Sequence, residues 1–342
     1  MRHPLKLQTV GSLDRFLVSA NVIRKEDNVH VAGLFHLNLV STCASSVFLR
    51  RGYIDKKQKD LYVTVGFMSD PEAFRYSGWM TLKDRNVDDA GIDATLCIRT
   101  PNKEMEVVHG LYDSFPLSQV SFWTDTSVTM ADIASDANTA TGEVMFGGVD
   151  YTRFNLATTK RFAIKDVYNK EQPSKGWETS QPVLLRVQSD SLAINSNVIF
   201  DIAAQATLLP PDVFESVVGP LKKLLVNPLA TKPGFDDGVL GQIDGFIGQE
   251  STKYRFACKY TKWLSPFKIG DLIVEKHMLF DKEDNECIIR IAQQPAGKPV
   301  VVGFHLIKHF YMSVSFNSIA GSTVTVSSRK ASEQPGALCA IC

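Results

Sequence analysis

Short apolar segments of the β type, separated at short intervals by turn residues, are the feature of this sequence that most constrains its fold. The segments are rich in Val, Leu, Ile and Phe, and most are shorter than a typical helix. Turn-forming pairs such as Asp70-Pro71, Gly147-Gly148 and Pro210-Pro211 separate them. This spacing predicts an all-β fold, mainly antiparallel, with a few short helices. The predicted strands are 31–39, 46–50, 61–67, 142–146, 183–187, 197–201, 272–274, 287–292, 299–302 and 311–316.

Two segments have the features of helices. Residues 211–225 open with prolines and carry Asp212 in the first turn, both of which are typical of a helix N-terminus. Their apolar positions follow helical spacing, so we predict a helix there. Residues 304–310 are predicted to form a second, shorter helix. Residues 234–248 combine several glycines with acidic residues and are predicted to form an exposed loop.

Length and composition indicate two lobes. At roughly 150 residues per domain, a chain of 342 residues corresponds to about two units. The composition changes near residues 150–160. The predicted units are therefore an N-terminal lobe over 1–155 and a C-terminal lobe over 156–330, followed by a flexible tail over 331–342.

The charge balance excludes several kinds of partner. Lys and Arg together number 37, as do Asp and Glu, so the formal net charge is zero. A neutral chain lacks the positive field that binds nucleic acid or anionic membranes, so we expect no nucleic-acid partner. No apolar run of about 18 residues occurs, which predicts no transmembrane segment. The first residues lack a signal-peptide pattern, so we expect a cytoplasmic protein, or a secreted one if a leader has been removed.

Three motifs, in the same order along the chain, resemble the pepsin-like aspartic protease family. Residues 142–150 are similar to the segment Gly-x-apolar-x-Phe-Gly-Gly-x-Asp of that family. Residues 200–211, beginning Phe-Asp-Ile-Ala, resemble its second active-site loop, and residues 300–311 resemble its late strand, glycine and helix. The resemblance covers residues 30–328. It implies a bilobal fold, with two β-barrel-like lobes and a central cleft, which is a natural place for a ligand.

The resemblance also implies a catalytic pair of aspartates, of which this sequence keeps one. Two close carboxylates share one proton because both cannot ionise, and each lies in an Asp-Thr-Gly turn. Asp201 matches the second aspartate, but Ile202 and Ala203 replace the threonine and the glycine. Residues 42–46 best match the first turn, so Thr42 stands where the first aspartate would be. A hydroxyl does not ionise near neutral pH, so we expect negligible peptide hydrolysis.

Two other acidic residues are alternative partners for Asp201. If Asp55 or Asp60 completed the pair, the expectation of no hydrolysis would reverse, although neither lies in a turn of small residues. Asp201 itself has two interpretations. It is either a lone acid–base group whose pKa is raised by burial, or a relic whose carboxylate accepts neighbouring backbone N–H groups.

The resemblance places further residues beside the cleft. Ser41, Thr42 and Ala203 belong to the two turns that would face the ligand. Val65 stands where the family carries the tyrosine of a hairpin that closes over substrate, and Tyr76 is a candidate replacement on the other arm. With Asp201 as the catalytic residue, these five are the predicted cleft residues.

The function predicted from these changes is a repurposed biosynthetic enzyme. A shaped, dry pocket and one acid–base group are sufficient for cyclisation or isomerisation of an apolar small molecule. The alternatives are a non-catalytic pseudoprotease that binds a peptide or protein, and an active aspartic endopeptidase. No cofactor is predicted.

Cysteine and histidine residues add three expectations. Cys258 and Cys287 fall where the family carries a disulfide, although in the cytosol they would be a pair of thiols. His305 and His309 have the spacing of two metal ligands on a helix, but no further ligand cluster is near, so no metal is predicted. The C-terminal Cys-Ala-Ile-Cys fits a prenylation signal and makes Cys339 a candidate for lipidation, without a preceding polybasic stretch.

Overall fold

The computed structural model describes the parts of the chain on which the following account rests. These are residues 2–10, 13–24, 30–38, 43–45, 60–67, 75–83, 94–97, 119–124, 142–146, 148–165, 176–187, 192–202, 204, 206–226, 241–243, 253–283, 286–315 and 321–330. The predicted strand 46–50 and the predicted tail 331–342 lie outside them.

The largest element of the fold is a 12-stranded sheet with the order β10-β25-β24-β8-β9-β1-β2-β3-β7-β4-β6-β5. Most neighbours in it are antiparallel, as the short segments and frequent turns predict. Its strands are β1 (Arg2–Val10), β2 (Leu13–Arg24), β3 (His30–Asn38), β4 (Cys43–Ser45), β5 (Asp60–Phe67), β6 (Arg75–Lys83), β7 (Ala94–Cys97), β8 (Gln119–Thr124), β9 (Gly142–Phe146), β10 (Lys160–Ala163), β24 (Phe310–Ser315) and β25 (Thr323–Ser328).

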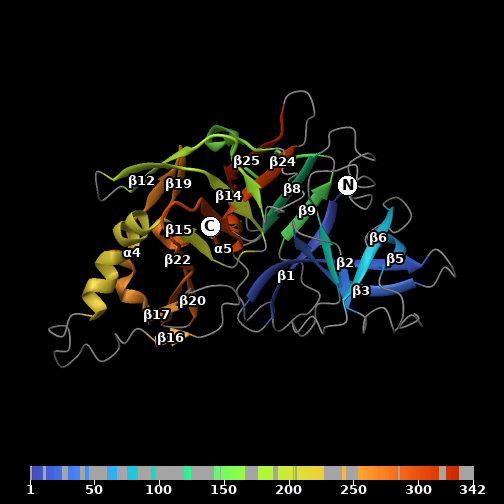
Figure 1. The fold of residues 1–342 in the computed structure, drawn as a ribbon, viewed down its shortest axis with the longest axis horizontal. Helices are drawn as coiled ribbons and strands as arrows, with labels where there is room; N and C mark the ends of the chain where they lie inside the picture. The colour runs from blue at the N-terminus through green and yellow to red at the C-terminus, as the bar shows by residue number, and fades with distance from the viewer. Residues whose placement is uncertain are drawn as a thin grey trace, which may run out of the picture.

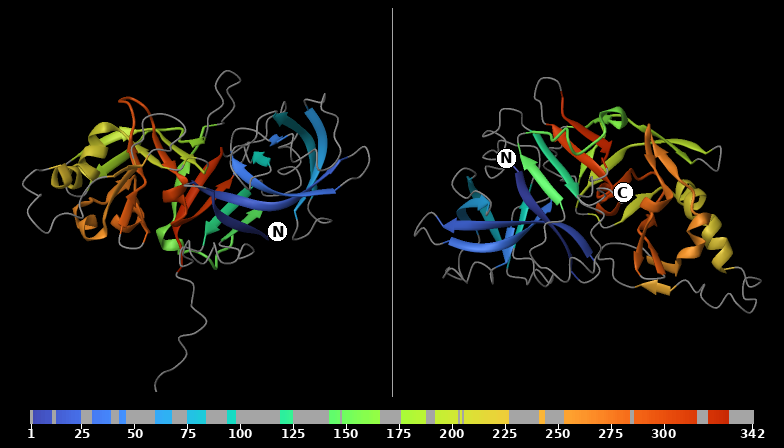
Figure 2. Two further views of the ribbon diagram at one scale, coloured as in Figure 1. Left: turned by 90° about the horizontal axis from the view of Figure 1, so that it is seen from below. Right: turned by 180° about the vertical axis from the view of Figure 1, so that it is seen from behind.

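This sheet joins the two halves of the chain. Met312 of β24 is paired with Phe122 of β8, so a strand from near the C-terminus continues a sheet begun by the first half. In Figure 1, β8, β9, β24 and β25 lie between the blue strands of the first half and the yellow and orange elements of the second. The views in Figure 2 show the same arrangement. The proposed boundary at residue 155 stays a prediction, because the sheet runs across it.

Three smaller sheets build the second half. A 5-stranded sheet has the order β11-β14-β23-β15-β22, and two 4-stranded sheets have the orders β13-β12-β18-β19 and β16-β17-β21-β20. Their strands are β11 (Trp177–Glu178), β12 (Val183–Val187), β13 (Ala193–Ser196), β14 (Val198–Asp201), β15 (Thr207–Leu209), β16 (Gly241–Ile243), β17 (Lys253–Ala257), β18 (Phe267–Ile269), β19 (Leu272–Val274), β20 (Phe280–Glu283), β21 (Glu286–Ile289), β22 (Ile291–Gln293) and β23 (Val300–Gly303).

Helices are few and mostly short, which confirms the predicted class. The predicted helix 211–225 is present as α4 (Pro211–Val226), and α5 (Phe304–Ile307) covers only the start of the predicted helix 304–310. In the described part of the chain, the 3₁₀ helices are η1 (Leu156–Thr158), η3 (Cys258–Trp263) and η4 (Lys276–Met278). The prediction of a loop over 234–248 is wrong at β16, which pairs with β17.

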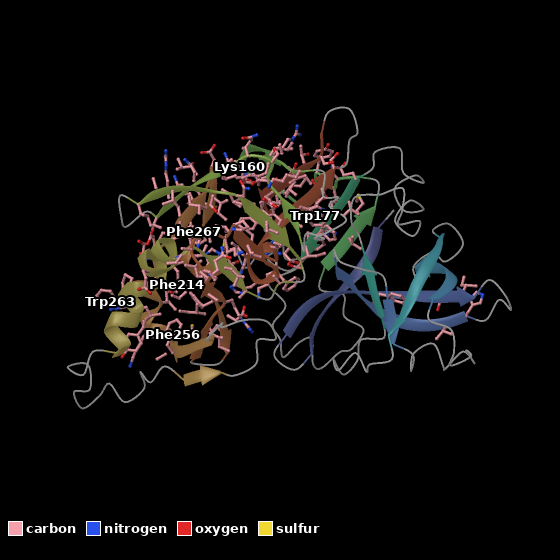
Figure 3. The ribbon with its side chains drawn as sticks, in the orientation of Figure 1. Lys160, Trp177, Phe214, Phe256, Trp263 and Phe267 are labelled. Carbon is pink, nitrogen blue, oxygen red and sulfur yellow. A yellow bond between two sulfur atoms is a disulfide. The ribbon has the colours of Figure 1, made fainter. Side chains whose placement is uncertain are left out.

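The second half has a continuous apolar core beneath α4. Val213, Val217 and Leu221 repeat at helical spacing on the buried face of α4, and Phe214 is buried beside them. Figure 3 labels Phe214 among the side chains of this half, together with Phe256 of β17 and Phe267 of β18. Each of these fully buried aromatic side chains contributes a large apolar area to the core.

A hydrogen-bonded network anchors the segment 148–152 to the large sheet. The Tyr311 hydroxyl accepts the backbone N–H of Asp150 at 2.8 Å and donates to Ser121 Oγ at 2.9 Å. Ser121 Oγ donates in turn to the carbonyl of Gly148 at 3.0 Å. Asp150 Oδ1 accepts both the N–H and the hydroxyl of Thr152, which closes the turn. The network therefore connects β8, β24 and the chain that follows β9.

We expect Tyr311→Phe to lower the free energy of unfolding by about 1–3 kcal/mol, because it removes the hydroxyl that Asp150 and Ser121 use while they remain buried. Urea denaturation measures the change. Tyr151→Phe is the matched control, since the Tyr151 side chain is 62% exposed, and it is expected to change stability little. Equal effects of the two substitutions would contradict this account.

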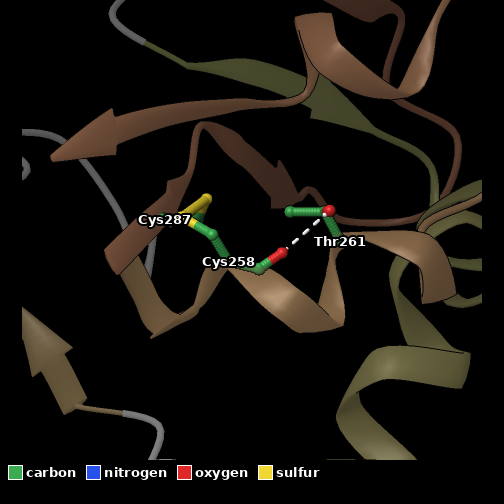
Figure 4. Close-up of a disulfide and its surroundings, with 3 residues drawn as sticks. All are labelled: Cys258, Thr261 and Cys287. Carbon is green, nitrogen blue, oxygen red and sulfur yellow. Dashed lines mark hydrogen bonds between the residues drawn. A yellow bond between two sulfur atoms is a disulfide. The ribbon is translucent and has the colours of Figure 1, made fainter. Parts of the chain in front are cut away.

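A disulfide joins the two cysteines that the family resemblance pairs. Cys258, at the start of η3, is bonded to Cys287 of β21, with the Cα atoms 5.0 Å apart. Figure 4 shows this disulfide and the Thr261 hydroxyl, which donates to the Cys258 carbonyl at 2.9 Å. The bond ties the start of η3 to β21, which pairs with β17 in the same sheet.

Removing this disulfide is expected to lower the free energy of unfolding by about 2–4 kcal/mol, because the cross-link spans a sequence separation of 29 residues and restricts the unfolded chain. The measurement is urea denaturation of Cys258→Ser/Cys287→Ser beside the wild type. A reductant should weaken the wild type and leave the double variant unchanged. A reductant that destabilises both equally would show that the effect has another origin.

Candidate functional site

Asp201 is the last residue of β14, and the strands around it determine its place. β14 runs parallel to β23, with Asp201 paired to Gly303, while β15 pairs with the other edge of β23. β23 therefore lies between β14 and β15. Residues 202–206 join β14 to β15, so this short connection crosses the end of β23. Asp201 itself is only 6% exposed.

Gly303 is required where the connection crosses. A Cβ atom at this position would lie 2.3 Å from the carbonyl oxygen of Ala206 and 2.7 Å from that of Ala204, both of which are backbone atoms. Such distances are far inside van der Waals contact, so a side chain cannot be added without moving the turn. The glycine thus permits the connection to lie directly against the end of β23.

Hydrogen bonds hold the Asp201 turn in this position. The Ala204 N–H donates to Asp201 Oδ1 at 3.2 Å and to the Asp201 carbonyl at 3.3 Å. The Phe304 N–H donates to the Ala204 carbonyl at 2.6 Å, and the Gly303 N–H donates to Thr207 Oγ1 at 3.3 Å. The turn that carries the carboxylate is therefore tied to the first residue of α5.

The first half of the chain repeats this strand arrangement. β3 runs parallel to β7, and β4 pairs antiparallel with the other edge of β7, so β7 lies between β3 and β4. β6 runs parallel to β4 on its outer side, as β22 runs parallel to β15. Asn38, the last residue of β3, is paired with Cys97, as Asp201 is paired with Gly303. The end of β3 is thus the positional counterpart of the end of β14.

The counterpart turn contains no acidic residue. The sequence has neither Asp nor Glu anywhere from His30 to Ile54, a range that includes β3, β4 and the connection between them. Ser41 and Thr42 fall in that connection and lie outside the described residues, and Thr42 immediately precedes β4. The strand pairing places Asn38, which sequence reasoning missed, at the end of β3. Neither Asn38 nor Thr42 supplies a carboxylate.

The alternative acidic partners are placed as follows. Asp60 is the first residue of β5, and Thr81 of β6 is paired both with Asp60 and with Cys43 of β4. β6 therefore separates Asp60 from β4, which places their backbones about 10 Å apart across the sheet. Asp55 lies outside the described residues.

The predicted hairpin residues are brought together. Val65 of β5 and Tyr76 of β6 are directly paired in the antiparallel register. Ala203, in the Asp201 turn, lies outside the described residues. The structure therefore joins Val65 to Tyr76 in one hairpin and places Asp201 at a strand end, while the contacts of Ser41, Thr42 and Ala203 stay predictions.

A charged cluster beyond α5 was not predicted from the sequence. Asp281 Oδ2 accepts Arg290 Nε at 2.6 Å, and Asp281 Oδ1 accepts Lys308 Nζ at 2.7 Å. His305 Nδ1 lies 3.4 Å from the same Oδ1. Burial alone would raise the pKa of Asp281, but His305, Lys308 and Arg290 together hold it well below its usual range. No local motif signals this cluster, because its members come from separate elements.

The described residues were searched for metal-ligand groups and for helices that could span a membrane. Among them, no group of three His, Cys, Asp or Glu side chains is arranged to hold a metal ion. None of the helices in the described part of the chain is long and apolar enough to cross a membrane. Cys339, the candidate for lipidation, lies outside the described residues.

Comparisons with known proteins identify the fold. No protein-family model matches the chain, and no curated protein matches its sequence. Among solved structures, the chain is similar to the aspartic proteinase from Irpex lacteus, with a TM-score of 0.62 and 11% sequence identity. The similarity covers 96% of this chain and 97% of that one. It shows that the chain has the all-β fold of a pepsin-like aspartic proteinase, and at this identity it shows the fold alone.

Proposed function

We propose that this protein is a pepsin-fold protein that does not hydrolyse peptides and uses Asp201 as a single acid–base group on an apolar small molecule. The proposed reaction class is cyclisation or isomerisation. Such a reaction needs a pocket that orients the substrate and excludes water, and one group that moves a proton. The ligand would bind in the cleft between the two halves, where the two matching turns would face each other.

One observation carries this proposal. The two halves contain the same arrangement of strands, but only the second arrangement ends in a carboxylate, at Asp201. The end of the first arrangement is Asn38, and no acidic residue occurs between His30 and Ile54. The asymmetry does not depend on the alignment of a single residue, because every position near that turn is non-acidic.

A single carboxylate favours proton transfer over peptide hydrolysis. Hydrolysis by a carboxylate pair requires one member to take a proton from water while the other, still protonated, polarises the carbonyl. An amide at Asn38 or a hydroxyl at Thr42 cannot share that proton, since neither ionises near neutral pH. Asp201, which is buried and accepts the Ala204 N–H, retains the capacity to give or accept one proton.

The proposed ligand contacts come from both halves. Ser41 and Thr42 would contact the ligand opposite Asp201, and Ala203 would lie beside it. Val65 and Tyr76 would cover it from the hairpin in which they are paired. Their side chains combine apolar groups with a few hydroxyls, as small-molecule sites usually do.

Wild-type protein is expected not to cleave denatured casein between pH 4 and pH 7, because it lacks the second carboxylate. The measurement is fragment release with and without a statine-type inhibitor. Cleavage that the inhibitor blocks would establish the alternative of an active endopeptidase. Tight binding of an extended peptide, with no turnover of any small molecule, would instead support the non-catalytic pseudoprotease.

The compartment is a separate proposal. The sequence predicts a cytoplasmic protein, whereas the Cys258–Cys287 disulfide favours the alternative of an oxidising compartment, where such bonds persist. Mass spectrometry of the protein isolated from its source, after trapping of free thiols, distinguishes the two. The same spectrum shows whether Cys339 carries a lipid.

A further inference from the structure

His305 is a buried histidine beside the Asp281 carboxylate. It lies in α5 and is only 2% exposed. Nδ1 of His305 is 3.4 Å from Asp281 Oδ1, whereas among the described residues Nε2 of His305 and Nε2 of His309 have no hydrogen-bond partner. Buried polar groups in native proteins almost always have a partner, so this pair requires an explanation.

The two rings belong to a row of three. The rings of His305 and His309 meet edge to face with centroids 5.8 Å apart, and those of His309 and His277 do so at the same distance. His277, in η4, is exposed to solvent. The row therefore leads from solvent at His277 to the buried ring of His305.

The charges around His305 oppose a further positive charge. Asp281, whose carboxylate lies beside it, already binds Arg290 and Lys308. On the other side, the Arg329 Nε donates to the His309 carbonyl at 3.3 Å. β2 also packs against α5, and its titratable residues are Asp14, Arg15 and Arg24.

Burial and these cations keep both rings neutral. Burial lowers the pKa of His305 below its usual value, with Lys308 and Arg290 acting in the same direction and Asp281 opposing them. Burial likewise lowers the pKa of His309 to about 2, with His305, Lys308 and Arg329 adding to the effect. Arg290 and Lys308 already place two positive charges near the Asp281 carboxylate. Protonation of one ring would add a third positive charge, and protonation of both would add a fourth.

The histidines are connected to the Asp201 turn through α5. His305 follows Phe304, whose N–H donates to the Ala204 carbonyl at 2.6 Å, and the Lys308 N–H donates to the Phe304 carbonyl at 2.9 Å. α5 begins immediately after Gly303, which is paired with Asp201. A displacement of α5 would therefore remove the contact that holds the turn carrying Asp201.

We propose that His305 and His309 are an acid-sensitive latch, which holds the Asp201 turn in place near neutral pH and releases it when the pH falls below about 6. In the unfolded chain a histidine takes up a proton below a pKa of about 6.5, whereas burial lowers the pKa of these two in the folded chain. Stability is therefore fully present above that pH and is lost as the pH falls, since the unfolded state then binds more protons. The inference does not depend on which reaction Asp201 serves.

The test is urea unfolding of the full chain between pH 8 and pH 5. For the wild type, the unfolding equilibrium constant is expected to rise from pH 7 to pH 5, by at most about 25-fold for each histidine that takes up its proton only on unfolding. His305→Gln is expected to lose its share of that rise. His30→Gln, at an exposed histidine, is expected to keep the full rise. The proposal would be overturned if the unfolding equilibrium constant of the wild type does not change with pH. It would also be overturned if that constant rises as much in His305→Gln as in the wild type.

A second measurement applies even if His305→Gln does not fold. The imidazole C–H resonances of the folded wild type are followed by NMR from pH 8 to the onset of unfolding. Those of His305 and His309 are expected to stay unshifted, while protection of the Phe304 amide from exchange, corrected for intrinsic rates, falls with pH. Titration of either ring near pH 6.5 in the folded chain would overturn the latch. Neither readout uses a substrate, so the outcome is independent of the proposed reaction.

Discussion

Asp201→Asn is expected to slow proton transfer at this site by about 10²- to 10⁴-fold, the contribution that a positioned acid–base group usually makes. The amide oxygen of Asn is still able to accept the Ala204 N–H that Asp201 Oδ1 now accepts at 3.2 Å. The turn should therefore keep its shape while the group that exchanges the proton is lost. A large loss of rate with little loss of stability is the expected signature.

The measurement uses 5-nitrobenzisoxazole, an apolar probe whose ring opens when a base removes one proton. Asp271→Asn is the matched control, because Asp271 is an exposed aspartate in the turn between β18 and β19. It should leave the rate unchanged, and circular dichroism should show the same fold in all three proteins. Equal rates in wild type and Asp201→Asn would contradict a role for Asp201 as a base toward this probe.

Gly303→Ala is expected to lower the free energy of unfolding by about 3–5 kcal/mol. The added methyl group would overlap the carbonyl oxygens of Ala206 and Ala204, and overpacking against backbone is itself costly. Moving the turn to relieve the overlap would also break the hydrogen bonds from Gly303 to Thr207 and from Phe304 to Ala204. The overlap and the loss of these hydrogen bonds are alternative outcomes, and either of them destabilises the variant.

Gly219→Ala is the control for this prediction. A Cβ atom at Gly219 would meet only the flexible side chain of Glu215, and alanine is the better helix former, so this change in α4 should be neutral or stabilising. Urea denaturation of both variants measures the difference. A Gly303→Ala protein as stable as the wild type would show that the turn has room that the structure does not show.

Sequence reasoning succeeded where local pattern and buried face agree. Residues 183–187 and 272–274 were predicted as strands from their apolar residues and are β12 and β19. The helix 211–225 was predicted from its proline start and its spacing, and α4 differs from it by one residue at its end. The predicted helix over 304–310 is wrong in its second part, because α5 ends at Ile307 and β24 begins at Phe310. Nearly every residue there is buried, so the segment has no periodicity that separates a helix from a strand.

The candidate site was predictable only in part. Asp201 could be identified because residues 200–211 form a local motif that resembles the second active-site loop of the pepsin-like family. Asn38 could not be identified from the sequence, because its equivalence to Asp201 depends on the pairing of β3 with β7. Pairing between distant strands is not encoded in either segment alone. The Asp281–Lys308 and Asp281–His305 contacts were likewise invisible, since their partners come from different elements.

The central proposal is that the turn between β3 and β4 contributes no carboxylate to the site of Asp201. The measurement that tests it most directly is the distance from the Asp201 carboxylate oxygens to the next acidic oxygen, in an experimental structure that resolves the turn between β3 and β4. The account predicts that Asn38 or Thr42 lies opposite Asp201 and that no second carboxylate lies within hydrogen-bonding distance. A carboxylate of Asp55, Asp60 or any other residue about 3 Å from Asp201 would contradict it.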